Sequence, residues 1–248
     1  MERTLDDQTL GAFGKRFIER RDVFAEQHAN GSYTPVRRPI KLGDLRDHVT
    51  GKHSYGHYLV STEGRCRLFA FDIDAAKEPV DWGDLGEFVP REAILNKNHA
   101  AYPVLIAQLN ALAEGLARKT HRTLGIPVAA AFSGRKGLHV YGFTGPDNAE
   151  TIREAGESVL KSFGVFEPSR GKNFWRHTTG YEAFEIEVFP KQVEVGKDGF
   201  GNLMRLPLGI HAVTKQKSHF VHFSGSPTQI KALPAHEAIE GGTAWFNE

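Results

Sequence analysis

The stretch Phe69-Ala70-Phe71-Asp72-Ile73-Asp74 constrains the chain most, because it carries two acidic residues to the end of an otherwise apolar run. Side chains alternate between the two faces of a β-strand, so Asp72 and Asp74 would point to the same side. Two neighbouring carboxylates are costly to bury unless a metal ion or a basic side chain lies between them. The pattern therefore indicates a strand ending in a cation site, although a strand that runs out into a turn would use the same residues.

The segments around this stretch predict an α+β fold. The acidic strand is expected over 65–73, paired as a hairpin with a short strand over 58–60. Apolar residues at helical spacing predict an amphipathic helix over 6–28. The same periodicity predicts helices over 93–119 and 148–163, packed on a mostly antiparallel sheet.

A second informative stretch is Ser133-Gly134-Arg135-Lys136-Gly137, which separates two apolar runs that read as strands. Glycines allow the backbone to approach a ligand closely, and the two cations lie at the tip of the turn. His139 follows on the second strand and projects from one of its faces. The arrangement could hold a triphosphate, and it could equally be a basic hairpin with a structural histidine.

Acidic residues recur on a later strand, where Glu185 and Glu187 share one face and apolar residues share the other. A third carboxylate near Asp72 and Asp74 would complete a site for two divalent cations and leave positions for phosphate oxygens. Arg205 and His211 follow, and both are residue types that bind phosphate.

The overall charge does not predict a polyanion-binding protein, because 31 Lys and Arg residues balance 30 Asp and Glu residues at a net charge of +1. Contacts with nucleic acid would have to come from local patches. One such patch is the basic and aromatic segment 170–177, which could bind a single strand or be an ordinary surface loop.

Cys66 is the only cysteine, which excludes an intrachain disulfide and a cysteine-based zinc site. At 248 residues with 40% hydrophobic residues, the chain can form one large domain or two lobes. No apolar run is long enough to span a bilayer, and the first residues do not resemble a signal peptide. We therefore expect a soluble, cytoplasmic protein with no membrane partner.

Four motifs in order, FDID, SGRKGLHV, EVFPKQ and RLPLGIH, resemble the catalytic core of the archaeo-eukaryotic primase superfamily. The FPKQ and LPLG-x-H segments are most similar to the primase-polymerases of CRISPR and other conflict systems. The resemblance implies a primase small-subunit-like core with an N-terminal αβ unit, an RRM-like unit and an active site in the cleft between them. It implies one catalytic core over 1–248, with approximate lobes 1–90 and 91–248.

The resemblance also implies roles for individual residues. The ligands of two Mg²⁺ or Mn²⁺ ions would be Asp72, Asp74 and Glu187, with Glu185 as the alternative third acid. The incoming nucleotide would contact Ser133, Arg135, Lys136, His139, Arg205 and His211, with Tyr58 near the sugar. No zinc is expected.

The activity implied is that of a primase-polymerase, a template-directed nucleotidyltransferase that makes and extends RNA or DNA primers. One metal ion would lower the pKa of the attacking hydroxyl while the second stabilises the triphosphate. Its partners would be a single-stranded DNA template, a primer strand and rNTP or dNTP, with replication, helicase or CRISPR-system proteins also possible. A gap-filling repair polymerase resembling bacterial ligase polymerase domains is the alternative enzyme, and a non-catalytic nucleic-acid-binding replication module is the alternative from another class.

Overall fold

Two antiparallel sheets organise the protein. Its computed structural model describes residues 5–164, 166–168, 173–177, 180–196, 199–223 and 229–240. The four-stranded sheet has the order β12 (Leu203–Arg205), β3 (Tyr55–Tyr58), β1 (Phe24–Gln27), β2 (Tyr33–Val36). The eight-stranded sheet has the order β14 (Lys231–Leu233), β13 (Phe220–His222), β7 (Val128–Phe132), β8 (Gly137–Asn148), β4 (Arg65–Ala75), β11 (Phe184–Phe189), β10 (Phe174–His177), β9 (Phe166–Pro168). A two-stranded hairpin joins β5 (Val80–Asp81) to β6 (Glu87–Phe88).

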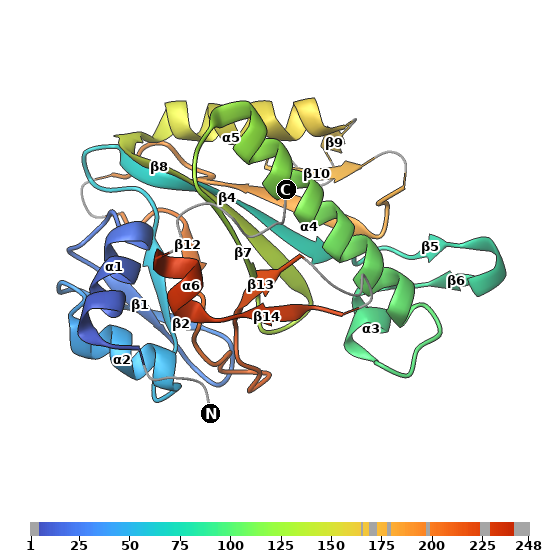
Figure 1. Cartoon of the computed structure of the whole chain (residues 1–248), viewed down its shortest axis with the longest axis horizontal. Helices are drawn as coiled ribbons and strands as arrows, with labels where there is room; N and C mark the ends of the chain where they lie inside the picture. The colour runs from blue at the N-terminus through green and yellow to red at the C-terminus, as the bar shows by residue number, and fades with distance from the viewer. Residues whose placement is uncertain are drawn as a thin grey trace.

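Helices gather in three places (Figure 1). The long helices α4 (Tyr102–Leu124) and α5 (Ala149–Phe163) lie side by side against the eight-stranded sheet. Three helices lie with the four-stranded sheet at one end of the molecule: α1 (Asp7–Phe17), α2 (Leu42–Thr50) and α6 (Ala235–Glu240). The 3₁₀ turn η1 (Gly83–Leu85) and helix α3 (Pro90–Leu95) lie near the β5–β6 hairpin at the other end. No helix in the described ranges is both long and apolar enough to cross a membrane.

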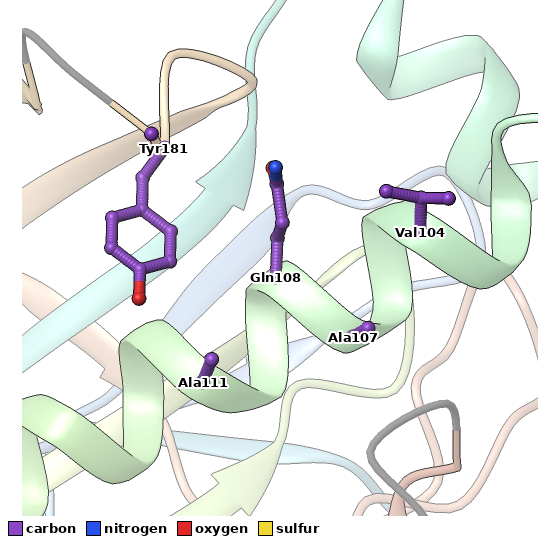
Figure 2. Close-up of a pocket in the computed structure, with 6 residues that line it drawn as sticks. Val104, Ala107, Gln108, Ala111 and Tyr181 are labelled. Atoms are coloured by element: carbon purple, nitrogen blue, oxygen red, sulfur yellow. The ribbon is translucent and has the colours of Figure 1, made fainter.

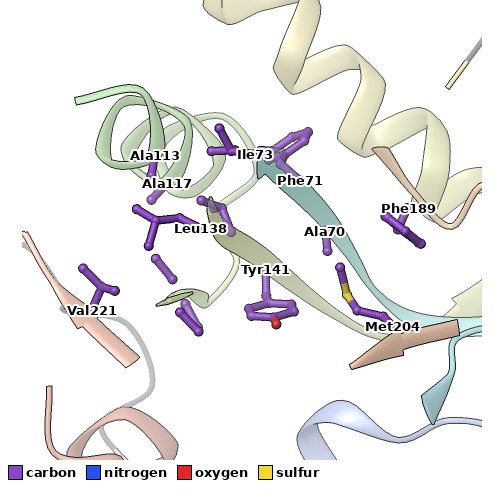
Figure 3. Packing of buried hydrophobic residues seen from close by; sticks show 14 of the residues in the cluster. Ala70, Phe71, Ile73, Ala113, Ala117, Leu138, Tyr141, Phe189, Met204 and Val221 are labelled. Atoms are coloured by element: carbon purple, nitrogen blue, oxygen red, sulfur yellow. The ribbon is translucent and has the colours of Figure 1, made fainter. Parts of the chain in front are cut away.

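Strand β4 lies inside the core because apolar side chains cover both of its faces. Phe71 and Ile73 project toward the helical layer, whereas Ala70 projects to the side of Tyr141 and Met204 (Figure 3). All five residues are at most 3% exposed. The core is continuous from the helices through the eight-stranded sheet to β12, so the acidic end of β4 is held on a rigid support.

The predicted helix over 6–28 is wrong beyond Phe17. Helix α1 ends there, because Ile18 has an extended backbone (φ −106°, ψ 109°), and the chain continues into β1. Phe24 and Ala25 are consecutive buried residues on opposite sides of that strand. Consecutive burial fits a strand between two partners better than one stripe of a helix.

The predicted hairpin between 58–60 and 65–73 is also wrong. Strand β3 pairs with β1 and β12, whereas β4 pairs with β8 and β11. The turn between them therefore connects two sheets. The strand–turn–strand around Gly134 is confirmed as β7 and β8, and the helix over 148–163 is confirmed as α5, where Asn148 accepts hydrogen bonds from the first turn.

Both sheets are assembled from distant parts of the chain. Strand β4 precedes residue 90 and lies in the eight-stranded sheet, while β12 follows residue 200 and lies in the four-stranded sheet. Each sheet thus takes strands from both sides of residue 90, where two lobes were expected to meet. The α+β class with mostly antiparallel sheets is confirmed.

Candidate active site

Three neighbouring strands bring the acidic residues together. In the register of the eight-stranded sheet, Asp72 of β4 lies opposite His139 of β8 on one side and opposite Glu187 of β11 on the other. Residues that face each other across antiparallel strands project to the same face, so these three side chains form a row. Asp74 lies two residues further along β4 and shares that face.

The two later acids share this face, but their surroundings differ. Glu185 lies opposite Asp74, is 4% exposed, and has its Oε1 3.5 Å from Nη2 of Arg176 on β10. Glu187 is 12% exposed, and its Oε1 forms an ion pair with Lys191, four residues further along the chain. Glu187 is thus the less buried of the two later acids, and it lies directly opposite Asp72.

Each acid of this face has a basic neighbour. Ion pairs join His139 Nε2 to Asp72 Oδ1 (3.3 Å), Lys136 to Asp74, and Lys191 to Glu187. The two lysines lie just outside the strands, so they can leave the acids without disturbing the sheet.

Burial and mutual repulsion disturb the protonation of the acids. Burial would raise the pKa of Asp72, but the charges of His139, Lys136 and Lys191 hold it below the ordinary value. Burial raises the pKa of Asp74, and the charge of Asp72 raises it further. The pKa of Glu187 is raised mainly by burial, with Lys191 opposing that shift. The pKa values of Asp74 and Glu187 thus stay raised even though a lysine lies beside each of them. A cation bound among these acids would stabilise their charged forms.

The acids suit Mg²⁺ or Mn²⁺ chemically, but they are not yet arranged as a ligand set. Within the described residues, no three His, Cys, Asp or Glu side chains are grouped closely enough to hold a metal ion. Carboxylate oxygens are the donors that hard divalent cations prefer. Asp72, Asp74 and Glu187 supply such oxygens on one face. The residues fit divalent cations, provided that the two lysines withdraw.

The turn between β7 and β8 lies next to the acids and is built around two glycines. Gly134 has a φ of +82°, which favours glycine, and a Cβ there would lie 3.0 Å from Cβ of His211 and 3.1 Å from Nη2 of Arg205. A Cβ on Gly137 would lie 2.1 Å from the carbonyl oxygen of Ile73, so only glycine lets the turn approach β4 this closely. Ser133 Oγ accepts a hydrogen bond from the Gly137 amide.

Arg205 and His211 are fixed against this turn by their other contacts. Arg205 is buried and donates to the carbonyl oxygen of Ser133, while its Nη1 has no hydrogen-bond partner among the described residues. Nδ1 of His211 accepts from the amides of Val213 and Thr214, so the proton of the neutral ring lies on the free Nε2. Burial, with the charges of Arg205 and Arg135, lowers the pKa of His211 to about 4. Both side chains thus direct unpaired N–H donors beside the glycine turn.

The remaining predicted contacts are placed as follows. Arg135 is partly exposed and makes no hydrogen bond or ion pair within the described residues. Tyr58 lies on β3 beside β12 and is 5% exposed, packed on Phe200 with a ring-centroid distance of 5.2 Å. The segment 170–177 is described only from Asn173 onward, because 170–172 lie outside the described residues.

Three supporting side chains were not assigned roles from the sequence. The Tyr141 hydroxyl lies 2.9 Å from Nδ1 of His139, and Thr214 donates to the Gly134 carbonyl. Lys191 lies over the rings of Phe189 (4.6 Å) and Phe174 (5.6 Å). The alternation of a strand could have indicated Tyr141, two residues after His139. The sequence carries no local signal for the other two contacts.

A separate hollow of about 460 Å³ lies along α4, where Val104, Ala107, Gln108 and Ala111 face Tyr181 (Figure 2). Its lining contains none of the candidate residues. The hollow therefore does not belong to the acidic site.

Comparison with protein families places the chain in a known group. A family model described as the Archaeo-Eukaryotic Primase domain of the TOTE conflict system matches residues 8–240. No curated protein matches the chain. The matched region contains both sheets and every candidate residue named above.

Proposed function

Since the chain belongs to the archaeo-eukaryotic primase domain family of TOTE conflict systems, we propose that it is a template-directed primase-polymerase that makes and extends primers. The observation that carries this proposal is the row Asp72–His139–Glu187 beside the glycine turn. Carboxylates that bind metal ions and donors that bind phosphates are the two requirements of nucleotidyl transfer.

The acids hold the divalent cations in this proposal. Asp72 and Glu187 bind from neighbouring strands, and Asp74 joins them when Lys136 leaves its carboxylate. Cations held by these acids would supply Lewis-acid chemistry, lowering the pKa of a primer hydroxyl and stabilising charge on the triphosphate. Glu187 is preferred to Glu185 as the third ligand, because it lies directly opposite Asp72 and is the less buried of the two acids.

The glycine turn and the basic residues hold the triphosphate. The free Nη1 of Arg205 and the Nε2 proton of His211 donate to phosphate oxygens, and Arg135 and the released Lys136 supply charge. The hydrogen bond between the Tyr141 hydroxyl and Nδ1 of His139 fixes the ring so that Nε2 of His139 faces Asp72. Ser133 supports the turn through its hydroxyl.

Primer synthesis on single-stranded DNA tests the proposal. Reactions with Mg²⁺ or Mn²⁺ compare rNTP with dNTP, with and without a preformed primer. Product is expected from the parent protein and not from Asp72→Asn combined with Asp74→Asn. The control is Asp81→Asn, an exposed acid of the β5–β6 hairpin. Equal synthesis by the double variant would refute the proposal, and extension without initiation would identify a gap-filling polymerase.

A further inference from the structure

The four-stranded sheet carries a second apolar cluster on the face that also bears Arg205. Its buried part consists of Val23, Ala25 and Tyr58, and Tyr33, Phe200 and Leu203 are only partly buried around them. Leu203 lies opposite Tyr58, and Arg205 lies two residues along the same strand. Side chains two residues apart share a face. The cluster is thus separate from the main core and continues toward the candidate active site.

Two arginines enclose two aromatic rings in this cluster. Tyr58 and Phe200 stack with their ring centroids 5.2 Å apart and an interplanar angle of 24°. Cζ of Arg37 lies 4.5 Å from the Phe200 centroid. Cζ of Arg20 lies 5.9 Å from the Tyr58 centroid and 6.0 Å from that of Phe200. We call Arg20, Tyr58, Phe200 and Arg37 the aromatic column.

Arg20 and Arg37 differ in burial and in hydrogen bonding. Arg20 is 4% exposed, is paired with Asp22, and donates to the carbonyl oxygens of Gly199 and Phe200. These bonds fix the loop that carries the Phe200 ring. Arg37 is exposed and has no hydrogen bond or ion pair within the described residues. The column therefore has one anchored end and one open end, where a planar cation is free to bind.

An exposed guanidinium that lies on an aromatic ring is suited to bind an unpaired base of a nucleic acid strand. Its flat face can stack on a base, and its N–H groups can bind a phosphate of the same strand. Bases in a duplex are already stacked on both faces, so a single strand fits better. Arg205 continues this face and donates to the carbonyl oxygen of Ser133 in the turn beside the acids, so the column lies on a path toward them.

We propose that Arg37 and Phe200 form a stacking site for one base of single-stranded nucleic acid. The identity of that strand as template or primer rests on the proposed function, but its binding requires neither metal nor nucleotide. The site accepts any base, because each base has a stacking face.

Binding in EDTA isolates this site from catalysis. The probe is a short single-stranded DNA with one 2-aminopurine, whose fluorescence is quenched on stacking, followed also by anisotropy. Arg37→Lys retains the charge and removes the planar group. We expect it to weaken binding about tenfold, the scale of one lost base stack, and to reduce the quenching. Phe200→Leu should have the same effect.

The neighbouring Arg38 provides a matched control. It is also exposed, but it is paired with Asp44 and lies over Phe24, on a different side of β2. Arg38→Lys should bind the probe like the parent protein. Unchanged binding and quenching in Arg37→Lys would overturn the stacking site, as would equal losses for single-stranded and duplex DNA, which indicate a phosphate contact only. Full competition by free nucleotide would also overturn it, since the ligand would then be a nucleotide.

The outcome is separable from that of the proposed function. If the Asp72 and Asp74 variants lose synthesis while Arg37→Lys binds normally, the activity stands and the stacking site fails. If those variants retain synthesis while Arg37→Lys loses binding, the stacking site stands and the assigned active site fails.

Discussion

Replacing His57 by Leu should leave the protein at least as stable at neutral pH and should flatten its acid sensitivity. His57 lies on β3 between Phe24 and Met204 and is 1% exposed, and in the described part of the chain neither ring nitrogen has a hydrogen-bond partner. An unsatisfied buried polar group costs about 1–3 kcal/mol. Leucine has a similar volume and no polar atom, so we expect a gain of about 1 kcal/mol at pH 8.

The acid effect follows from the pKa of the ring. Burial, with the charges of Arg67 and His48, lowers the pKa of His57 from 6.5 to about 3. Above pH 6.5 both the folded and the unfolded protein hold a neutral ring. Below it only the unfolded state takes up the proton, so the free energy of unfolding falls by about 1.4 kcal/mol per pH unit. At pH 5 the loss is about 2 kcal/mol, and His57→Leu should remove it.

His48 is the matched comparison, because it is equally buried but fully bonded. Its Nδ1 accepts from the amide of Tyr55, and its Nε2 lies 3.0 Å from the Pro207 carbonyl oxygen. Burial lowers its pKa to about 4, so it has a similar acid effect. His48→Leu leaves these backbone groups unpaired and should cost about 2–3 kcal/mol at pH 8.

The measurement is urea unfolding followed by tryptophan fluorescence from pH 8 to pH 5. Comparing each variant with the parent cancels the contributions of other titrating groups. A loss of more than about 2 kcal/mol at pH 8 for His57→Leu would contradict the reasoning. An unchanged dependence of the unfolding free energy on pH would contradict it as well.

Three further predictions concern the site. Glu187→Gln should reduce metal-dependent synthesis more than about a hundredfold, whereas Glu185→Gln should cost about tenfold, and the reverse order would identify the other acid as ligand. Lys191→Met should raise Mn²⁺ affinity about tenfold in a spin-resonance titration, because the competing ammonium is gone; weaker binding would mean that the lysine supports the metal site. Gly137→Ala should lower the free energy of unfolding by about 2–3 kcal/mol in a thermal melt, because its Cβ would overlap a β4 carbonyl. The control Gly11→Ala, in open space on α1, should raise that free energy by about 0.5–1 kcal/mol. An unchanged melt for Gly137→Ala would show that the turn can move.

Local patterns predicted the parts of the site that depend on local geometry. The alternation of β4 placed Asp72 and Asp74 on one face, and the glycines of the β7–β8 turn marked a close approach of backbone to backbone. These features depend on neighbouring residues only. The order of the four motifs then indicated the family, which the match over residues 8–240 confirms.

Long-range features were outside the reach of those patterns. Two strands that follow each other with a tight turn usually pair, yet β3 and β4 belong to different sheets. Nothing in the local sequence states which sheet a strand joins. The ion pair of Lys136 with Asp74 and the contact of Lys191 with Glu187 likewise depend on how the folded sheet places the ends of its strands.

The exchange of strands between the two sheets has a consequence for any cut in the chain. Strand β4 is the central member of one sheet, and β12 closes the edge of the other next to β3. A protease that nicks the exposed tip of the β5–β6 hairpin would leave two fragments, each holding a strand that the partner fragment needs. The fragments should stay associated through the hydrogen bonds of the β4–β8, β4–β11 and β3–β12 strand pairs. They should therefore elute together from a size-exclusion column under native conditions.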